Sequence, residues 1–201
     1  MKTAVLVTPL TVTIPIIKDA DYIGVDAGCI KILKQGLKLA FGVGDFDSMD
    51  PETFEKMKNI SNLVIHPVRK NETDSELALE ICQKKGYERL ILCGGLHGRI
   101  DHTIANIRLL MYRFPNLILE DDHQRIYYLS KGDHVLKKNS THISFFAVEK
   151  TVVTLKGFAY PLDKYTVYPK DILTVSNEIV EESARVEIHQ GSLLCVETDI
   201  Q

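Results

Sequence analysis

The first 120 residues alternate short apolar runs with segments of helical pattern, and this alternation restricts the fold more than any other feature of the chain. The apolar runs cover residues 4–7, 22–25, 39–43, 63–66, 89–93 and 117–120. Each run is apolar throughout rather than at alternate positions, which is typical of strands covered on both faces of a sheet. Helical patterns cover residues 27–36, 50–58, 73–86 and 101–114.

Several of the helical segments carry start and stop signals. Thr73 and Glu76 have the spacing of a capping box, and Asp50 followed by Pro51 is typical of a helix start. Gly86 lies where the third of these patterns, residues 73–86, should stop. The strand–helix–strand order predicts an α/β domain whose mainly parallel sheet has helices on both faces.

The composition and the pattern of apolar runs change from about Lys131. Short runs rich in Val, Thr, Ile and Tyr follow one another at 141–148, 151–157, 165–169, 172–177, 184–190 and 192–198. Turn signals separate these runs, and no segment after Pro115 has a convincing helical pattern. We therefore predict a small C-terminal antiparallel β-sandwich over residues 131–201, after an α/β domain over residues 1–130.

The net charge and the cysteines indicate which kinds of partner the chain binds and in which cellular compartment it works. The 201 residues carry a net charge of −3, which argues against general binding to nucleic acid or membranes. Thr and Pro interrupt the apolar N-terminus, which makes it a poor signal peptide and a poor membrane span. The four cysteines are far apart and form no CxxC pair. We expect reduced, buried thiols in a cytoplasmic protein with no nucleic-acid or membrane partner.

Acidic residues follow several of the predicted strands. In an open parallel sheet, ligands bind beyond the carboxyl ends of the strands, so side chains placed there should share one cleft. The acidic residues at these ends are Asp26, Asp45, Asp47, Asp74 and Asp101, and the basic residues beside them are Arg69, Lys70 and Arg99. Carboxylates gathered in this way repel one another unless a cation lies between them.

This set of residues is suited to phosphoryl transfer. Oxygen ligands alone favour a hard divalent ion, most naturally Mg²⁺, which commonly completes its shell with water and phosphate. The basic residues and the glycine-rich stretch 94–99 can meet phosphate oxygens. In such reactions the protein supplies position and charge rather than a covalent nucleophile.

Each residue also has a simpler interpretation. Asp74 and Asp101 begin helices, where acids are favourable without any ligand. Asp45 and Asp47 could be solvated turn residues, and His102 with Asn106 could be a structural pair on one helix face. The chain has no P-loop and no dinucleotide fingerprint, and its Cys and His spacing fits no familiar zinc site. The functional interpretation rests on the recurrence of polar residues at consecutive strand ends.

Five ordered motifs resemble the thiamine pyrophosphokinase (thiamin diphosphokinase) family. They are "GDFDS" (44–48), "KNETDSELAL" (70–79), "GGLHGRIDHTIANI" (94–107), "GFAYPL" (157–162) and "VSNEI" (175–179). The resemblance implies an α/β domain followed by a β-sandwich, working as a homodimer with thiamine bound at the interface. It implies an enzyme of thiamine diphosphate biosynthesis, a Mg²⁺-dependent transferase that moves a pyrophosphoryl group from ATP to the hydroxyl of thiamine, releasing AMP.

The resemblance also implies roles for individual residues. Asp45, Asp47 and Asp74 would hold Mg²⁺, Asp26 would lie near the reacting groups, and Arg99 and Asp101 would engage phosphate and the metal or hydroxyl. The expected substrate-binding residues are Lys70, Thr73, His102, Asn106, Ser176 and Asn177, of which the last two would lie near thiamine.

The chain departs from the family pattern in places. A glycine is common where His97 stands, the stretch 8–15 replaces a glycine-bearing loop, and there is no tryptophan to stack on thiamine. Two other functions stay open at this point. One is another Mg²⁺-dependent phosphoryl- or nucleotidyl-transfer enzyme, and the other is a non-catalytic sensor of thiamine.

Overall fold

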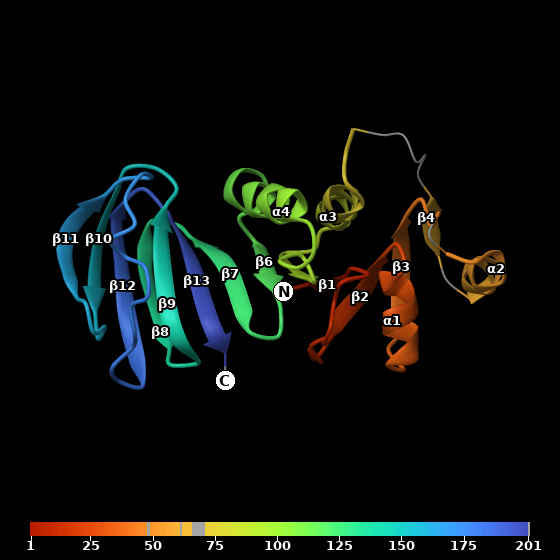
Figure 1. Cartoon of the computed structure of the whole chain (residues 1–201), viewed down its shortest axis with the longest axis horizontal. Coiled ribbons are helices and arrows are strands. Elements are labelled where there is room, and N and C mark those ends of the chain that lie inside the picture. The colour runs from red at the N-terminus through yellow and green to blue at the C-terminus, as the bar shows by residue number, and fades with distance from the viewer. Residues whose placement is uncertain (48, 61, 66–70, 201) are drawn as a thin grey trace. The chain divides into compact units, whose positions relative to one another are not determined.

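The structure is a computed structural model that describes residues 1–47, 49–60, 62–65 and 71–200. The chain forms two compact units, Met1–Asp121 and Asp122–Gln201 (Figure 1). The sequence suggested a boundary near residue 130, whereas the structure divides the chain at 121. The strand at Gln124–Leu129 pairs with the last strand of the chain and therefore belongs to the second unit.

The first unit is built on a parallel sheet. Its strands are β1 (Thr3–Val7), β2 (Ala20–Val25), β3 (Leu39–Gly44), β4 (Leu63–Ile65), β5 (Arg89–Cys93) and β6 (Leu117–Glu120). They lie in the order β4-β3-β2-β1-β5-β6, and each neighbouring pair is parallel. The parallel sheet predicted from the apolar runs is confirmed.

The helices of this unit are α1 (Gly28–Lys34), α2 (Pro51–Ile60), α3 (Asp74–Lys84) and α4 (Ile100–Tyr112). Of these, α2 and α3 begin at the capping residues that the sequence indicated. The Oγ1 of Thr73 accepts a hydrogen bond from the N–H of Glu76 at 3.1 Å, and Asp50 Oδ1 accepts one from the N–H of Thr53 at 2.9 Å. Gly86 follows α3 with a φ of +75°, a left-handed conformation that glycine adopts without strain.

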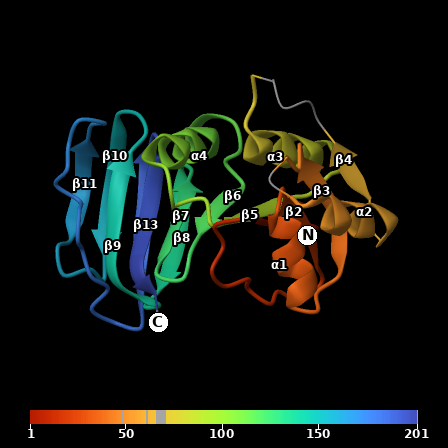
Figure 2. The same ribbon diagram turned by 45° about the vertical axis from the view of Figure 1, so that its right-hand side comes forward.

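Helices cover both faces of this sheet, as predicted. All residues of β1 are buried, and because side chains alternate along a strand, they feed two cores. Val5 and Val7 pack with Cys29 and Ile32 of α1 on one face. Figure 2 shows α3 on the side of the sheet opposite to α1. The strands are therefore covered on both sides, which explains why their sequences are apolar throughout.

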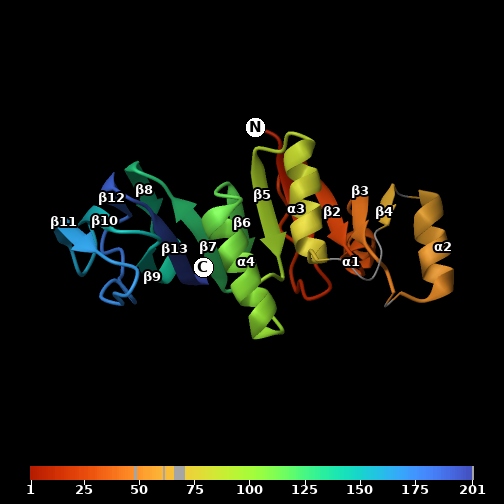
Figure 3. The same ribbon diagram turned by 90° about the horizontal axis from the view of Figure 1, so that it is seen from above.

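The second unit is antiparallel. Its strands are β7 (Gln124–Leu129), β8 (Gly132–Lys137), β9 (Ser140–Ala147), β10 (Thr151–Lys156), β11 (Leu162–Val167), β12 (Ser183–Gln190) and β13 (Leu193–Ile200). β13 lies between β7 and β9, and a separate sheet has the order β11-β10-β12-β8 (Figure 3). Phe145 of β9 meets Phe158 edge to face at 5.6 Å between ring centres, within a core to which both sheets contribute.

Two details of this unit differ from the sequence interpretation. Residues 124–137 contain two strands that we did not expect, because their charged and turn-forming residues concealed them. Residues 172–177, expected as a strand, form a turn, and Asn177 makes an isolated β-bridge with Ile143 of β9.

The four cysteines are free and buried, as expected. Burial raises the pKa of the Cys29 thiol to about 12, and the neighbouring charge of Asp26 adds to the effect. The Cys29 thiol is therefore protonated at neutral pH. None of the helices in the described ranges is long and apolar enough to cross a membrane.

Candidate active site

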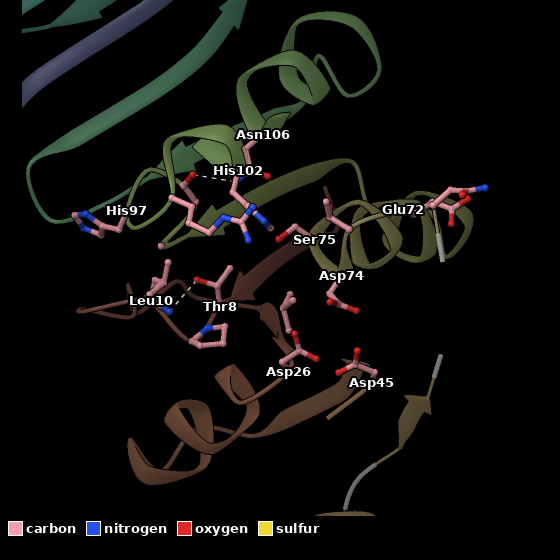
Figure 4. Close-up of a pocket in the computed structure, with 17 residues that line it drawn as sticks. Thr8, Leu10, Asp26, Asp45, Glu72, Asp74, Ser75, His97, His102 and Asn106 are labelled. Carbon is pink, nitrogen blue, oxygen red and sulfur yellow. Dashed lines mark hydrogen bonds between the residues drawn. The ribbon is translucent and has the colours of Figure 1, made fainter. Parts of the chain in front are cut away.

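The strand order places a crevice between β1 and β5. From β1 the sheet grows through β2 to β4 in one direction, and from β5 to β6 in the other. The loops that leave β1 and β5 therefore diverge, and ligands of open α/β sheets bind at such a point. A cavity of about 530 Å³ lies there, lined by residues that follow β1, β2, β3 and β5 and by the starts of α3 and α4 (Figure 4).

Three of the predicted acidic residues meet in this cavity. Asp26, Asp45 and Asp74 come from the ends of β2 and β3 and from the start of α3 (Figure 4). In Figure 4 their carboxylates point toward a common space. The structure therefore gathers residues that are up to 48 positions apart in the sequence (74 − 26) into one acidic end of the cavity.

The local backbone conformation fixes the position of Asp26 directly after β2. Its φ is +48°, a left-handed conformation that Asp tolerates better than most residues, and its N–H donates to the carbonyl of Val43 at 2.9 Å. The carboxylate lies against the backbone of Gly44, where an added Cβ would come within 1.8 Å of Asp26 Oδ1. Glycine at position 44 is therefore required for this placement of Asp26.

A buried aromatic ring separates the two acids of the "GDFDS" stretch. Phe46 is 4% exposed and packs against Phe54 with 5.8 Å between ring centres. Its φ of +56° is unusual for so large a side chain, and we attribute its persistence to the burial of the ring. Asp45 lines the cavity, whereas Asp47 is exposed and is not among the described residues that line it. The N–H of Asp47 donates to Asp45 Oδ1 at 3.2 Å.

Substituting Gly44→Ala should displace the Asp26 carboxylate and lower kcat/KM by about tenfold or more, because small misplacements of reacting groups are costly. The control is Gly36→Ala, since nothing lies within 4 Å of a Cβ at that position and its φ of +73° affects stability alone. Steady-state kinetics and thermal unfolding of both variants separate the two effects. An unchanged kcat/KM in folded Gly44→Ala protein would contradict the role of Asp26.

Arg99 and Asp101 form a pair at the start of α4. The guanidinium of Arg99 donates to both carboxylate oxygens of Asp101, at 3.1 and 2.5 Å. These bonds lower the pKa of Asp101 below its usual value. Arg99 lines the cavity, and Asp101 lies outside the part of the lining that the structure describes. Asp101 therefore orients Arg99 in this arrangement.

The remaining predicted residues of the first unit have distinct positions. Thr73 caps α3, and His102 is exposed at the cavity wall. Asn106 is 7% exposed, and its Nδ2 donates to the carbonyl of Gly95 at 2.9 Å, so it holds the glycine-rich loop that follows β5. Lys70, and Arg69 beside it, lie outside the described residues.

Two family models match the chain in succession. The model of the thiamin pyrophosphokinase catalytic domain matches residues 16–119, and the model of the vitamin B1 binding domain of thiamin pyrophosphokinase matches residues 133–193. The chain belongs to the thiamin pyrophosphokinase family.

Individual relatives agree with this assignment. A thiamine pyrophosphokinase from Bacillus subtilis is 28% identical over 183 residues, covering 87% of this chain and 86% of the relative. The crystal structure of the thiamine pyrophosphokinase from Bacillus subtilis has a TM-score of 0.87 at 26% identity. That of a thiamin pyrophosphokinase family protein from Enterococcus faecalis has a TM-score of 0.85 at 27% identity, and both comparisons cover 100% of each chain. The predicted fold class, family and enzyme class are confirmed.

Ser176 and Asn177, the residues that the family resemblance placed near thiamine, lie in the second unit. Ser176 is exposed and has a φ of +58°, and its N–H donates to Ser144 Oγ at 2.9 Å. Asn177 is 2% exposed, and its Oδ1 accepts from the N–H groups of Tyr160 and Glu178 at 3.0 and 2.9 Å. Its Nδ2 donates to the carbonyl of Tyr160 at 2.9 Å. A direct contact between this amide and a substrate would require an exchange of these bonds.

Asn177→Ala should lower stability by on the order of 1–3 kcal/mol, because it removes the three hydrogen bonds that its amide makes with backbone groups of Tyr160 and Glu178. Ser176→Ala removes an exposed hydroxyl next to it and should change stability much less. The midpoint of thermal unfolding measures both. Equal stability of the two variants would show that the internal bonds of Asn177 contribute little.

The acidic end of the cavity fits a divalent cation in its chemistry. In the ranges that the structure describes, no group of three or more His, Cys, Asp or Glu side chains is arranged to hold a metal ion. Mg²⁺, however, is commonly held by one or two carboxylates together with water and substrate phosphates. The oxygen donors of Asp26, Asp45 and Asp74 therefore fit an ion of this kind in their chemistry.

Several residues that line the cavity had escaped the sequence analysis. The most informative are Thr8, Pro9 and Leu10, which directly follow β1. Their position after the first apolar run was a usable signal. These residues were not identified from the sequence, because nothing in the stretch 8–15 resembles the glycine-bearing loop of the family.

Proposed function

We propose that this chain transfers the pyrophosphoryl group of ATP to the hydroxyl of thiamine, giving thiamine diphosphate and AMP. The observation that carries the proposal is the convergence of Asp26, Asp45 and Asp74 in the cavity of the unit that matches the family's catalytic domain. Pyrophosphoryl transfer from a nucleoside triphosphate needs a site that can hold a cation between carboxylates and phosphate, and this cavity supplies the carboxylates. Neither a different phosphoryl- or nucleotidyl-transfer reaction nor a sensor role is favoured by the comparisons.

The acidic residues would hold Mg²⁺ and orient the substrates. Asp45 and Asp74 would bind the ion, with Asp47 joining if its loop turns inward, and the ion would neutralise charge on the triphosphate when bound. Arg99, oriented by Asp101, would bind phosphate oxygens, together with Lys70 from the segment before α3. Thr73 and His102 also line the cavity. Asn106 would act by holding the loop at Gly95.

The reaction forms one bond and breaks one bond. The hydroxyl oxygen of thiamine attacks the β-phosphorus of ATP in line with the oxygen that bridges to the α-phosphate, and AMP leaves with that oxygen. The hydroxyl proton passes to a carboxylate or to water, and Asp26 would orient the hydroxyl. The protein contributes mainly position and charge, which is how catalysis of this class usually works.

The second unit would bind thiamine and form the dimer. The match of residues 133–193 to a vitamin B1 binding domain supports this assignment. The exposed apolar residues of this unit also support it, since they form surface that a partner or ligand would cover: Tyr160, Tyr168, Ile172, Leu173, Val175 and Val180. We propose a cytoplasmic homodimer with thiamine near Ser176 at the interface, which sedimentation analysis with and without thiamine can test.

Product analysis tests the proposed reaction. Purified protein is incubated with ATP, Mg²⁺ and thiamine, and the products are separated by chromatography. Equal amounts of AMP and thiamine diphosphate support the proposal. Release of inorganic phosphate, a nucleotidylated product, or thiamine binding without turnover would each replace it with one of the other functions.

A further inference from the structure

The cavity has a second end that differs in chemistry from the acidic one. Figure 4 shows Leu10 and His97 at one end and Asp45 and Asp74 at the other. The loops after β1 and β5 form this second end, and they pack closely. A Cβ on Gly94 would lie 2.3 Å from Thr8 Oγ1, and a Cβ on Gly98 would lie 2.6 Å from Leu10 Cδ1.

The loop after β1 cannot act as a phosphate cradle without breaking its own bonds. The N–H of Thr8 donates to Thr11 Oγ1 at 3.1 Å, that of Leu10 donates to Thr8 Oγ1 at 3.2 Å, and that of Thr11 donates to the carbonyl of Thr8 at 3.2 Å. Pro9 has no N–H to offer. Anion binding by a loop depends on free N–H groups, so this loop instead presents the apolar side chains of Pro9 and Leu10.

His97 lines the same end, and one of its ring nitrogens lies beside a carboxylate. Its Nε2 lies 3.5 Å from Oδ2 of Asp121, a carboxylate whose side chain is 3% exposed. The other oxygen, Oδ1, accepts a hydrogen bond from the N–H of Gly94 at 2.9 Å, which ties Asp121 to the loop. In a neutral imidazole that turns its Nε2–H toward Asp121, Nδ1 is a hydrogen-bond acceptor.

We propose that this end binds the base of the nucleotide and that His97 selects for adenine. The flat ring would lie against Pro9 and Leu10, and its exocyclic 6-amino group would donate to Nδ1 of His97. Asp121 is then a positioning residue that sets the orientation of the imidazole. The proposal rests on the proposed function, in which ATP is the donor and its phosphates occupy the acidic end.

The position of this end favours the nucleotide base over thiamine as the occupant. The apolar and acidic ends belong to one cavity in the unit that matches the catalytic domain, so a nucleotide can extend from one to the other. The match to a vitamin B1 binding domain covers residues 133–193 in the other unit.

The test compares AMP with IMP, which carries a carbonyl oxygen in place of the 6-amino group. Calorimetry measures the Kd of each for the wild-type chain and for His97→Ala. We expect the wild type to bind AMP about tenfold more tightly than IMP, and His97→Ala to lose most of this preference, because one hydrogen bond to the base is lost. His97→Gln retains an acceptor and should keep part of the preference. Asp121→Asn should reduce it without abolishing AMP binding.

Two further variants test whether the effect of His97→Ala is specific. His123→Ala removes an exposed histidine outside the described lining of the cavity and should leave both Kd values unchanged. Leu10→Ala should weaken AMP and IMP equally, since it touches the ring rather than the amino group.

The outcomes are decisive in both directions. Three results for folded His97→Ala protein would each overturn the proposal. They are an unchanged preference for AMP over IMP, an equal loss of AMP and IMP binding, and a change confined to the KM for thiamine. Absence of any preference in the wild type would do the same. If the preference holds but no thiamine diphosphate forms, the base site stands and the proposed function fails.

Discussion

Asp74→Asn is expected to lower turnover by about 100-fold or more while leaving the fold intact. Asp74 is the first residue of α3 and lines the acidic end of the cavity. The cap of α3 is made by Thr73, whose Oγ1 accepts from Glu76, so the substitution does not remove a capping bond. The change removes one charge next to the phosphates and weakens binding of the cation in the transition state.

The matched control is Asp50→Asn. Asp50, like Asp74, lies at the start of a helix, and hydrogen bonds from Thr53 hold the pKa of its carboxyl below the usual value. Asn accepts the same capping bond, and Asp50 lies outside the described lining of the cavity, so activity should stay close to that of the wild type. Steady-state kinetics and circular dichroism of both variants give the comparison. Near wild-type turnover in folded Asp74→Asn protein would reduce Asp74 to a residue that merely favours the helix start.

Removing divalent cations should abolish turnover and leave the melting temperature unchanged. The acidic end holds Asp26, Asp45 and Asp74, and a triphosphate brought beside them without a cation would be repelled. The described residues show no metal cluster on which folding would depend. Excess EDTA followed by titration with Mg²⁺ should therefore restore activity from a fully folded protein.

The same Mg²⁺ titration also tests whether Asp74 contributes to cation binding. Asp74→Asn should need a higher Mg²⁺ concentration for half-maximal activity than the wild type, whereas Asp50→Asn should not. Full turnover in excess EDTA would exclude the proposed role of the cation. A loss of folded structure in EDTA would point to a structural ion instead.

Features that depend on neighbours along the chain could be predicted from the sequence. The cap at Thr73 joins residues three positions apart, and the cap at Asp50 does the same, so the sequence contains all that these bonds need. The strands of the first unit were visible because burial on both faces demands apolar residues at every position. Their carboxyl ends meet at one edge in any parallel sheet, which is why Asp26, Asp45 and Asp74 could be expected in one cleft.

Local patterns were less informative in the second unit. β7 and β8 contain charged residues, such as Arg125 and Asp133, and were not recognised as strands. Residues 172–177 are rich in strand-forming residues yet form a turn. Strand propensity mostly reflects packing against neighbouring strands, and the sequence does not say which neighbours those are.

The sequence by itself determined the family, the two kinds of sheet and the set of acids. The tertiary structure decided which of them face the cavity. Asp45 and Asp47 are equivalent in the sequence, but the burial of Phe46 against Phe54 places Asp45 in the cavity and leaves Asp47 exposed. The family resemblance placed Asn177 near thiamine, but its side chain is buried and bonded to backbone groups of Tyr160 and Glu178. Side-chain direction depends on contacts between distant segments, and those contacts exist only once the chain has folded.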